Sequence, residues 1–393
     1  MAINDMTLEQ ASTIFSAVYA ECTGLGENDQ IDTKDFVTMG QTALKTGYDP
    51  LITAISQVLS NTIFSIRPYT RKLKIMEVTE QQYGNHTRKL NIVDTPIEDD
   101  ERFKLVDGES IDQYKVRKPQ VVQTNFYGSN IWQKAITIYK DQLDVAFSSL
   151  EEFGRFITMV VQNAQDMIEA VHESVARFAL CNLIGGTVAS SADRYIDLLA
   201  AYNEATSQEL TKEQALSPDY FADFARYIFA KIKEVSRALT ERSVVWHVNP
   251  IVGYIMRHTP YEEQKLVTLA PFFDRVDANV LSITYNDEYL KLIEHEEVSF
   301  WNNPYEPASI NVDASYMAVD GTIQNHAFSN SNVIGVLFDR EAAGYVVGST
   351  WSAPTPFNAA GGYSNIFYHF TDRYWNDSTE NAVVFGIGEI DLT

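Results

Sequence analysis

Residues 148–186 read SSLEEFGRFITMVVQNAQDMIEAVHESVARFALCNLIGG, and this stretch decides the fold. Apolar side chains recur in it at steps of three and four residues, which places them on one face of an α-helix. Ser149 followed by Glu152 has the capping-box spacing of a helix start, and Gly185-Gly186 predicts the helix end. The predicted helix, 148–184, is roughly 50 Å long at about 1.5 Å per residue. Its apolar face consists of Phe153, Ile157, Val160, Val161, Ala164, Met167, Ile168, Val171, Val175 and Phe178.

The residues before this helix predict a group of short helices, followed by a long polar segment. Residues 1–66 carry short apolar helix patterns, one of which follows Asp49-Pro50. From 67 to 120 the apolar period changes to two, with turn dipeptides at Gly84-Asn85 and Asp107-Gly108. Hairpins with so few large apolar residues are marginal by themselves. We therefore expect 67–120 to be an extended β arm that depends on another surface.

The residues after the helix alternate between helix and strand patterns. Ser217-Pro218 predicts the start of a helix with one apolar face, and 244–248 is typical of a buried strand. The class is therefore α+β. A helix far longer than the mean of about 11–12 residues is either a core helix of a large α/β enzyme or the spine of a broad, flat subunit, and the flanking arm and returning strands favour the spine. The strands expected after residue 279 are 280–285, 298–301, 310–319, 333–338, 366–370 and 383–387.

Charge is distributed unevenly along the chain. The 393 residues carry 30 Lys and Arg against 53 Asp and Glu, a net charge of −23. Residues 67–118 hold eleven Lys and Arg and ten Asp and Glu, so the remainder carries −24. Such a chain is a poor ligand for nucleic-acid phosphates. The arm is either a solvated mixed-charge surface or a surface that forms ion pairs with other subunits. Its candidate intersubunit contacts are Arg71, Lys72, Arg88, Lys89, Arg102, Lys104, Lys115, Arg117 and Lys118.

No group of residues in the sequence predicts catalysis or metal binding. Phosphate-loop and nucleophile-elbow motifs are absent, the seven histidines lack metal-ligand spacing, and Cys22 and Cys181 stand alone. We therefore predict no catalytic residue, no metal and no cofactor. The acidic run 294–297 and the aromatic residues of 300–375 leave an acidic carbohydrate-active enzyme as an alternative. No apolar run reaches the roughly 18 residues of a membrane span, and the acidic start lacks a signal peptide's basic region, so we expect a soluble protein without membrane contact.

The order of these elements resembles that of the major capsid proteins of tailed phages, which have the Hong Kong 97-type fold. The local sequence resembles that of capsid proteins of small short-tailed phages in particular, and the resemblance extends over residues 47–390. The strings that carry the resemblance are Gly47-Tyr48-Asp49-Pro50, Arg67-Pro68-Tyr69, Asp107-Gly108, Asp112-Gln113-Tyr114, Ala146-Phe147-Ser148 and Gly335-Val336-Leu337-Phe338-Asp339-Arg340-Glu341-Ala342.

The resemblance implies a division of the chain. It makes 1–66 an N-terminal arm with helices and 67–120 the extended β loop. The peripheral domain is 121–210 with 345–393, including the spine helix 148–184. The axial domain is 211–344.

The resemblance also implies a function. The chain is expected to assemble with itself, as pentamers and hexamers, into an icosahedral shell around the double-stranded DNA of a phage, in the cytoplasm of the host bacterium. A separate scaffolding protein and a portal are the expected partners, and DNA is enclosed without sequence-specific binding. An encapsulin-type compartment shares the fold and remains an alternative.

Overall fold

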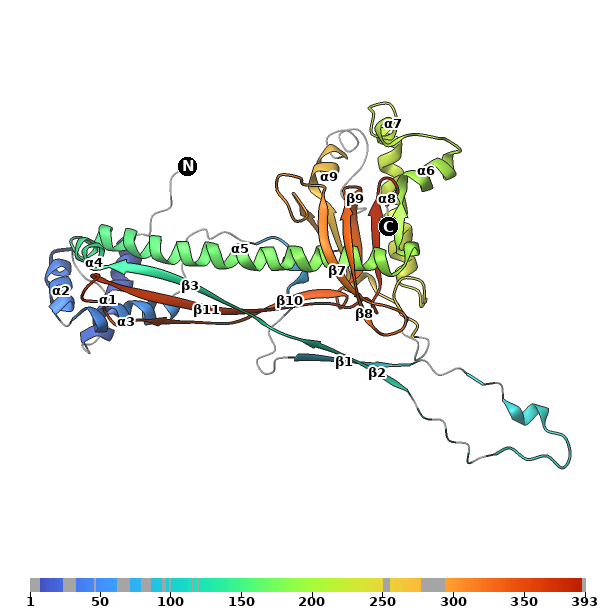
Figure 1. Cartoon of the computed structure of the whole chain (residues 1–393), viewed down its shortest axis with the longest axis horizontal. Helices are drawn as coiled ribbons and strands as arrows, with labels where there is room; N and C mark the ends of the chain where they lie inside the picture. The colour runs from blue at the N-terminus through green and yellow to red at the C-terminus, as the bar shows by residue number, and fades with distance from the viewer. Residues whose placement is uncertain are drawn as a thin grey trace. The chain divides into compact units, whose positions relative to one another are not determined.

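The computed structural model describes residues 8–23, 33–45, 47–61, 71–78, 86–93, 97–98, 100–112, 114, 116, 118, 120–249, 255–276 and 294–390. The chain divides into two compact units (Figure 1). Unit 1 consists of Met1–Lys72, Ser129–Glu173 and Val346–Arg373. Unit 2 consists of Leu73–Gly128, Ser174–Tyr345 and Tyr374–Thr393.

Unit 1 packs N-terminal helices and a sheet against the first part of the long helix. The short helices expected before residue 66 are confirmed. Aromatic rings fill this core: Phe15 lies 4.3 Å from Phe36 and 5.4 Å from Phe153, measured between ring centroids. Ile366 and Tyr368 add the buried face of the sheet β10-β11-β3 to the same cluster. The elements are α1 (Leu8–Thr23), α2 (Thr33–Lys45), α3 (Tyr48–Asn61), β3 (Asn130–Tyr139), α4 (Lys140–Ala146), α5 (Leu150–Ser190), β10 (Ala343–Pro354) and β11 (Tyr363–Asn376).

The predicted spine is the helix α5, which has 41 residues. Its start is confirmed, because the Glu152 backbone N–H donates to the Ser149 side-chain oxygen over 3.2 Å. Its predicted end is wrong, because α5 continues through Gly185-Gly186 to Ser190. A Cβ atom on Gly185 would lie 2.8 Å from the Ala314 Cβ, and one on Gly186 would lie 3.1 Å from the Tyr316 Cβ. The two glycines therefore allow the helix to approach strand β7 (Ile310–Met317) closely, and they do not end the helix.

The faces of α5 also differ from the expected amphipathic pattern. Glu173 and Arg177 lie outside the predicted apolar face, yet both are buried. Met167 and Phe178 are 49% and 55% exposed. The Arg177 guanidinium lies 3.9 Å from the centroid of the Phe300 ring and donates to the Phe300 carbonyl oxygen. A planar cation can be buried when an aromatic face and a carbonyl replace its water.

Unit 2 is built around a five-stranded sheet in the order β4-β12-β9-β5-β6. Its central strands are buried along their whole length, as in a sheet covered on both faces. The apolar face of α8 expected from the sequence packs in this core through Phe224, Ile228 and Leu239, among others. The elements are β4 (Tyr195–Asp197), α6 (Leu198–Thr206), α7 (Lys212–Ala215), α8 (Phe221–Leu239), β5 (Gln264–Leu269), α9 (Ala270–Val276), β6 (Glu294–Val298), β7, β8 (Ile323–Asn330), β9 (Val333–Asp339) and β12 (Ala382–Gly386).

Most of the strands expected in the last third are confirmed as β7, β9, β11 and β12. The strand expected at 298–301 lies instead at 294–298, and the expected strand 280–285 lies outside the described residues. The predicted strand 244–248 is wrong. That stretch bends, and its Val248 N–H donates to the Ser378 carbonyl, so it crosses the turn between β11 and β12.

The predicted start of α8 is also wrong by one turn. The Ser217 hydroxyl donates to the Gln214 carbonyl over 2.6 Å, which closes α7. The Ser217 carbonyl accepts the Phe221 N–H, and α8 begins at Phe221. The Ser217-Pro218 pair therefore marks the end of α7 and does not mark the start of α8.

Candidate functional site

The base of the arm is a two-stranded ribbon. Strand β1 (His86–Ile92) pairs antiparallel with β2 (Val121–Tyr127), with His86 opposite Tyr127 and Ile92 opposite Val121. We call these two strands the arm base. The sequence predicted hairpins around Gly84-Asn85 and Asp107-Gly108. The first dipeptide lies outside the described residues, and the pairing that is observed joins segments about thirty residues apart.

The segment between these strands, 97–118, is the arm tip. Every residue of 97–118 whose burial is described is exposed. The Asp107-Gly108 turn is confirmed: the Glu109 N–H donates to the Val106 carbonyl over 3.0 Å, and Gly108 has a φ of +93°. No strand flanks the turn among the described residues of this segment; a short 3₁₀ turn, Glu101–Lys104, precedes it.

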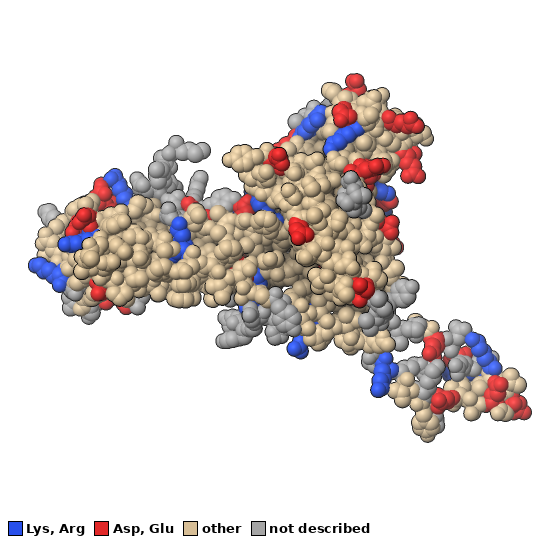
Figure 2. Space-filling model, in the orientation of Figure 1, with Lys and Arg blue, Asp and Glu red and all other residues tan. Residues whose placement is uncertain are grey.

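The arm tip exposes a concentrated set of apolar side chains. Ile97 is fully exposed and Tyr114 is 81% exposed. Lys and Arg alternate with Asp and Glu on the same segment, so both colours occur there in Figure 2. Single exposed apolar residues are ordinary, whereas a cluster marks a surface that binds a partner. The apolar members are Ile97, Leu105, Val106, Ile111, Tyr114 and Val116.

Among the described candidate contact residues, Arg71 and Lys89 form ion pairs with residues far away in their own chain. The Arg71 guanidinium donates to both carboxylate oxygens of Glu169, over 2.6 and 2.7 Å. The Lys89 ammonium lies 3.0 Å from Asp377 and from Glu341 and also contacts Glu380. These two cations therefore hold the start of the arm and the strand β1 in place within the subunit.

The other candidates are mainly at the surface. Lys72, Arg88, Lys104 and Lys118 are exposed. Arg102 forms an exposed ion pair with Asp100, its near neighbour in the sequence. Lys115 and Arg117 lie outside the described residues.

Sequence reasoning missed the carboxylates that hold the start of the arm. The whole of 67–120 was expected to be β, but Lys74–Met76 is a 3₁₀ turn. The Glu296 carboxylate accepts the N–H groups of Leu73 (2.7 Å) and Ile75 (3.4 Å), and Leu73 has a φ of +64°. A non-glycine residue at positive φ is unusual, and no sequence pattern signals it. Glu296 belongs to the acidic run considered above for acid–base chemistry, and its carboxylate instead has a structural role.

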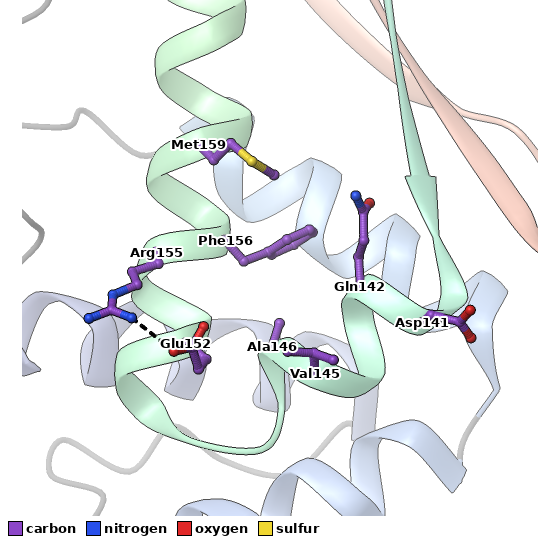
Figure 3. Close-up of a pocket in the computed structure, with 8 residues that line it drawn as sticks. All are labelled: Asp141, Gln142, Val145, Ala146, Glu152, Arg155, Phe156 and Met159. Carbon is purple, nitrogen blue, oxygen red and sulfur yellow. Dashed lines mark hydrogen bonds and ion pairs between the residues drawn. The ribbon is translucent and has the colours of Figure 1, made fainter.

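A second candidate surface is an open pocket of about 450 Å³ in unit 1, between α4 and the first turns of α5. Figure 3 shows the Phe156 ring pointing from α5 toward α4, with the Arg155–Glu152 ion pair at the side. The floor is apolar and the edge is charged, which suits an apolar side chain of another protein better than a small polar substrate. The lining residues are Asp141, Gln142, Val145, Ala146, Glu152, Arg155, Phe156 and Met159.

The described part of the chain contains no cluster of three or more His, Cys, Asp or Glu side chains that could hold a metal ion. None of the described helices is both long and apolar enough to cross a membrane. His172, the histidine of the spine, is buried against Asp372 and the Phe370 ring, so it belongs to the core of unit 1.

Comparisons with known proteins bear on the family and the fold. A model of the Phi29-like phage major capsid protein family matches residues 11–386. A chain in the capsid structure of Staphylococcus phage Andhra has a TM-score of 0.54 at 10% identity, and the match covers 84% of this chain and 87% of that one. A chain in the structure of the head fiber and inner core protein gp22 of native bacteriophage P68 has a TM-score of 0.52 at 12% identity, covering 84% and 88%. No curated protein matches this chain. The structural likeness confirms the α+β capsid fold expected from the sequence.

Proposed function

The chain belongs to the Phi29-like phage major capsid protein family, and from this we propose that its subunits form pentamers and hexamers that close into an icosahedral shell around double-stranded DNA. The family is structural, so the protein is a shell-forming component of the virion and not an enzyme. This removes the carbohydrate-active enzyme considered from the sequence. We keep the division into N-terminal arm (1–66), extended loop (67–120), peripheral domain (121–210 and 345–393) and axial domain (211–344) as part of the proposal.

The observation that carries the proposal is the exposed apolar arm tip. Full burial of one Val, Leu or Ile side chain contributes roughly 1.5–3 kcal/mol. Among the described residues of 97–118, six apolar side chains are exposed in the single subunit, so this contribution becomes available only when another surface covers them. Rings of identical subunits join a patch on one copy to a different patch on the next. An arm that lies on the next copy satisfies that requirement.

The net charge of the chain supports the proposal that the enclosed DNA does not bind to the shell. Outside 67–118 the net charge is −24, and repulsion between like charges opposes binding of phosphates. In this proposal the shell therefore confines the DNA without binding it. A separate scaffolding protein and a portal complete the proposed set of partners, and assembly takes place in the cytoplasm of the host.

Electron microscopy of the purified full-length protein tests the function. We expect closed particles in the megadalton range, formed by the chain with or without co-expressed scaffolding protein. In particles from infected cells, nuclease should leave an enclosed double-stranded DNA intact. A protein that remains a monomer of 44.4 kDa under both conditions would contradict the proposal, and particles that enclose proteins in place of DNA would indicate a compartment of the encapsulin type.

Reversing two exposed arm charges separates contacts between subunits from contacts within one. We expect Arg88→Glu with Lys118→Glu to raise the subunit concentration needed for assembly severalfold, most strongly at low salt, because exposed ion pairs contribute about 0.2–1 kcal/mol each and are screened. Arg71→Glu should instead lower the thermal stability of the free subunit, since Arg71 pairs with Glu169. Light scattering at several salt concentrations measures the first effect and calorimetry the second. Equal assembly of the double variant and the natural protein at all salt concentrations would remove Arg88 and Lys118 from the interface.

A further inference from the structure

Two exposed turns of unit 2 contain the same dipeptide, aspartate followed by glycine. Asp107-Gly108 is the turn of the arm tip, and Asp320-Gly321 joins β7 to β8. Both glycines have a positive φ, +93° and +79°, and a Cβ atom added to either would meet nothing within 4 Å. In an Asp-Gly pair the aspartate carboxyl can react with the next backbone nitrogen, because glycine places no side chain over that nitrogen. The two turns differ in whether hydrogen bonds hold these two groups.

At Asp320-Gly321 both groups are held. The Asp320 carboxylate accepts from the Thr322 hydroxyl over 2.6 Å and from the Thr322 N–H over 2.9 Å. These hydrogen bonds lower the pKa of Asp320, so its carboxyl stays ionised, and an ionised carboxylate is a poor electrophile. The Gly321 N–H donates to the Ala318 carbonyl over 2.9 Å. The paired strands β7 and β8 run up to this turn and oppose its opening.

At Asp107-Gly108 the same two groups have no hydrogen-bond partner among the residues that the structure describes. The bond that closes this turn runs from the Glu109 N–H to the Val106 carbonyl, so it uses neither the Asp107 carboxyl nor the Gly108 N–H. The described residues around the turn form no strand that would hold it. The Asp107 side chain can therefore rotate until its carboxyl carbon meets the Gly108 nitrogen, a motion that the hydrogen bonds of Asp320 oppose.

We propose that Asp107 of the free subunit is a site of spontaneous covalent modification, at which the chain isomerises to isoaspartate through a cyclic imide formed with Gly108. The Gly108 nitrogen attacks the Asp107 carboxyl carbon, a C–N bond forms, and the hydroxyl leaves with the amide proton as water. Water then adds to the Asp107 main-chain carbonyl carbon and breaks its bond to the Gly108 nitrogen. The chain is now linked through the side-chain carbon. One water is released and one is consumed, so the step needs no oxidant, reductant or further reactant.

Isomerisation changes the arm tip where it exposes its apolar side chains. The backbone then runs through the Asp107 Cβ, which adds one carbon atom to the chain of the turn. The hydrogen bond between Val106 and Glu109 spans this link, so the relative positions of Leu105 and Ile111 on its two sides change. The consequence for assembly rests on the proposed function. If the arm tip covers the next copy, isomerised subunits should enter shells less readily than unmodified ones.

Incubation of unassembled full-length subunits at neutral pH and physiological temperature tests the modification. Peptide mass spectrometry with chromatographic separation measures isoaspartate at each position, because the isomer keeps its mass but differs in retention and fragmentation. We expect at least about tenfold more isoaspartate at 107 than at 320, since hydrogen bonds to a charged group contribute enough to change a rate by that factor.

Two variants change the two turns separately. Asp107→Glu keeps the negative charge, but its longer side chain would have to close a larger ring, so the modification at 107 should be lost. Thr322→Val removes the hydroxyl donor to Asp320 at nearly the same side-chain shape, and it should raise isoaspartate at 320 severalfold. No isoaspartate at 107 in the natural protein, equal amounts at 107 and 320, or an unchanged amount at 320 in Thr322→Val would each overturn the inference.

The effect on assembly is measured apart from the chemistry. Incubated natural subunits are brought to assembly conditions, and isoaspartate at 107 is compared between the particles and the subunits left in solution. We expect severalfold less in the particles, and incubation should cost Asp107→Glu none of its own initial yield. Equal isoaspartate in both fractions would overturn the effect on assembly. A chain that forms no shells at all would count against the proposed function, while the free subunits would still decide the modification.

Discussion

Replacing residues 97–118 by a short Gly/Ser linker is expected to leave a folded subunit that no longer closes into shells. The subunit should fold because the described residues on either side of this segment, Val93 and Gln120, already lie together. Ile92 pairs with Val121, and the Val93 N–H donates to the Gln120 carbonyl over 3.0 Å. Opposite residues of an antiparallel pair are about 5 Å apart, so a few residues can join them. Assembly should fail because the exposed apolar tip is lost.

Calorimetry and electron microscopy check the two halves of this expectation. The linker variant should melt cooperatively within a few degrees of the natural subunit, and particles should be absent at concentrations where the natural protein forms them. A matched variant keeps the length of the arm and replaces Ile97, Tyr114 and Val116 by Ser. If apolar contact is the cause, this variant should also assemble poorly. Closed shells of normal size from the linker variant would show that the arm tip is dispensable.

The variant Gly185→Val is expected to destabilise unit 2 by roughly 1–3 kcal/mol, the usual cost of forcing extra atoms into a packed core. The new Cβ would lie 2.8 Å from the Ala314 Cβ and 3.1 Å from the Phe328 Cβ, and both neighbours are strand residues that cannot turn away. Helix propensity acts in the opposite direction, because glycine costs about 1 kcal/mol in a helix interior relative to alanine. The clash should outweigh this gain.

Thermal unfolding of three further variants isolates the close approach. Ser174→Val, at an exposed position of the same helix, should change stability little. Gly185→Ala should destabilise less than Gly185→Val, and combining it with Ala314→Gly should recover part of the loss, because contacting residues do not contribute independently. A Gly185→Val protein as stable as the natural one would mean that α5 and β7 are not held at this distance.

The local pattern of the sequence was sufficient to predict several elements of secondary structure. The helix start at Ser149, the short helices before residue 66 and the apolar face of α8 all depend on contacts between residues within a few positions of one another. The strands β9 and β12 are apolar runs, and β7 largely alternates apolar with polar residues. The expectation of an arm has a similar basis, since 67–120 has alternation and turns but too few apolar residues to form a core.

Contacts between residues far apart in the sequence determined the features that local patterns did not predict. Gly185-Gly186 is a stop signal by local rules, but the approach of β7, about 130 residues later, makes it a packing site. Arg177 lies outside the predicted apolar face, and it is buried because Phe300 supplies its partner. Lys89 is a candidate intersubunit contact by sequence, but its side chain is only 16% exposed because the 377–381 turn supplies its partners. The sequence by itself determined the elements whose reasons lie within a few turns, and the capsid family that their order resembles. Only the tertiary structure decided which charges are buried and how the arm is attached, because a charge leaves water only when partners from elsewhere in the chain replace that water.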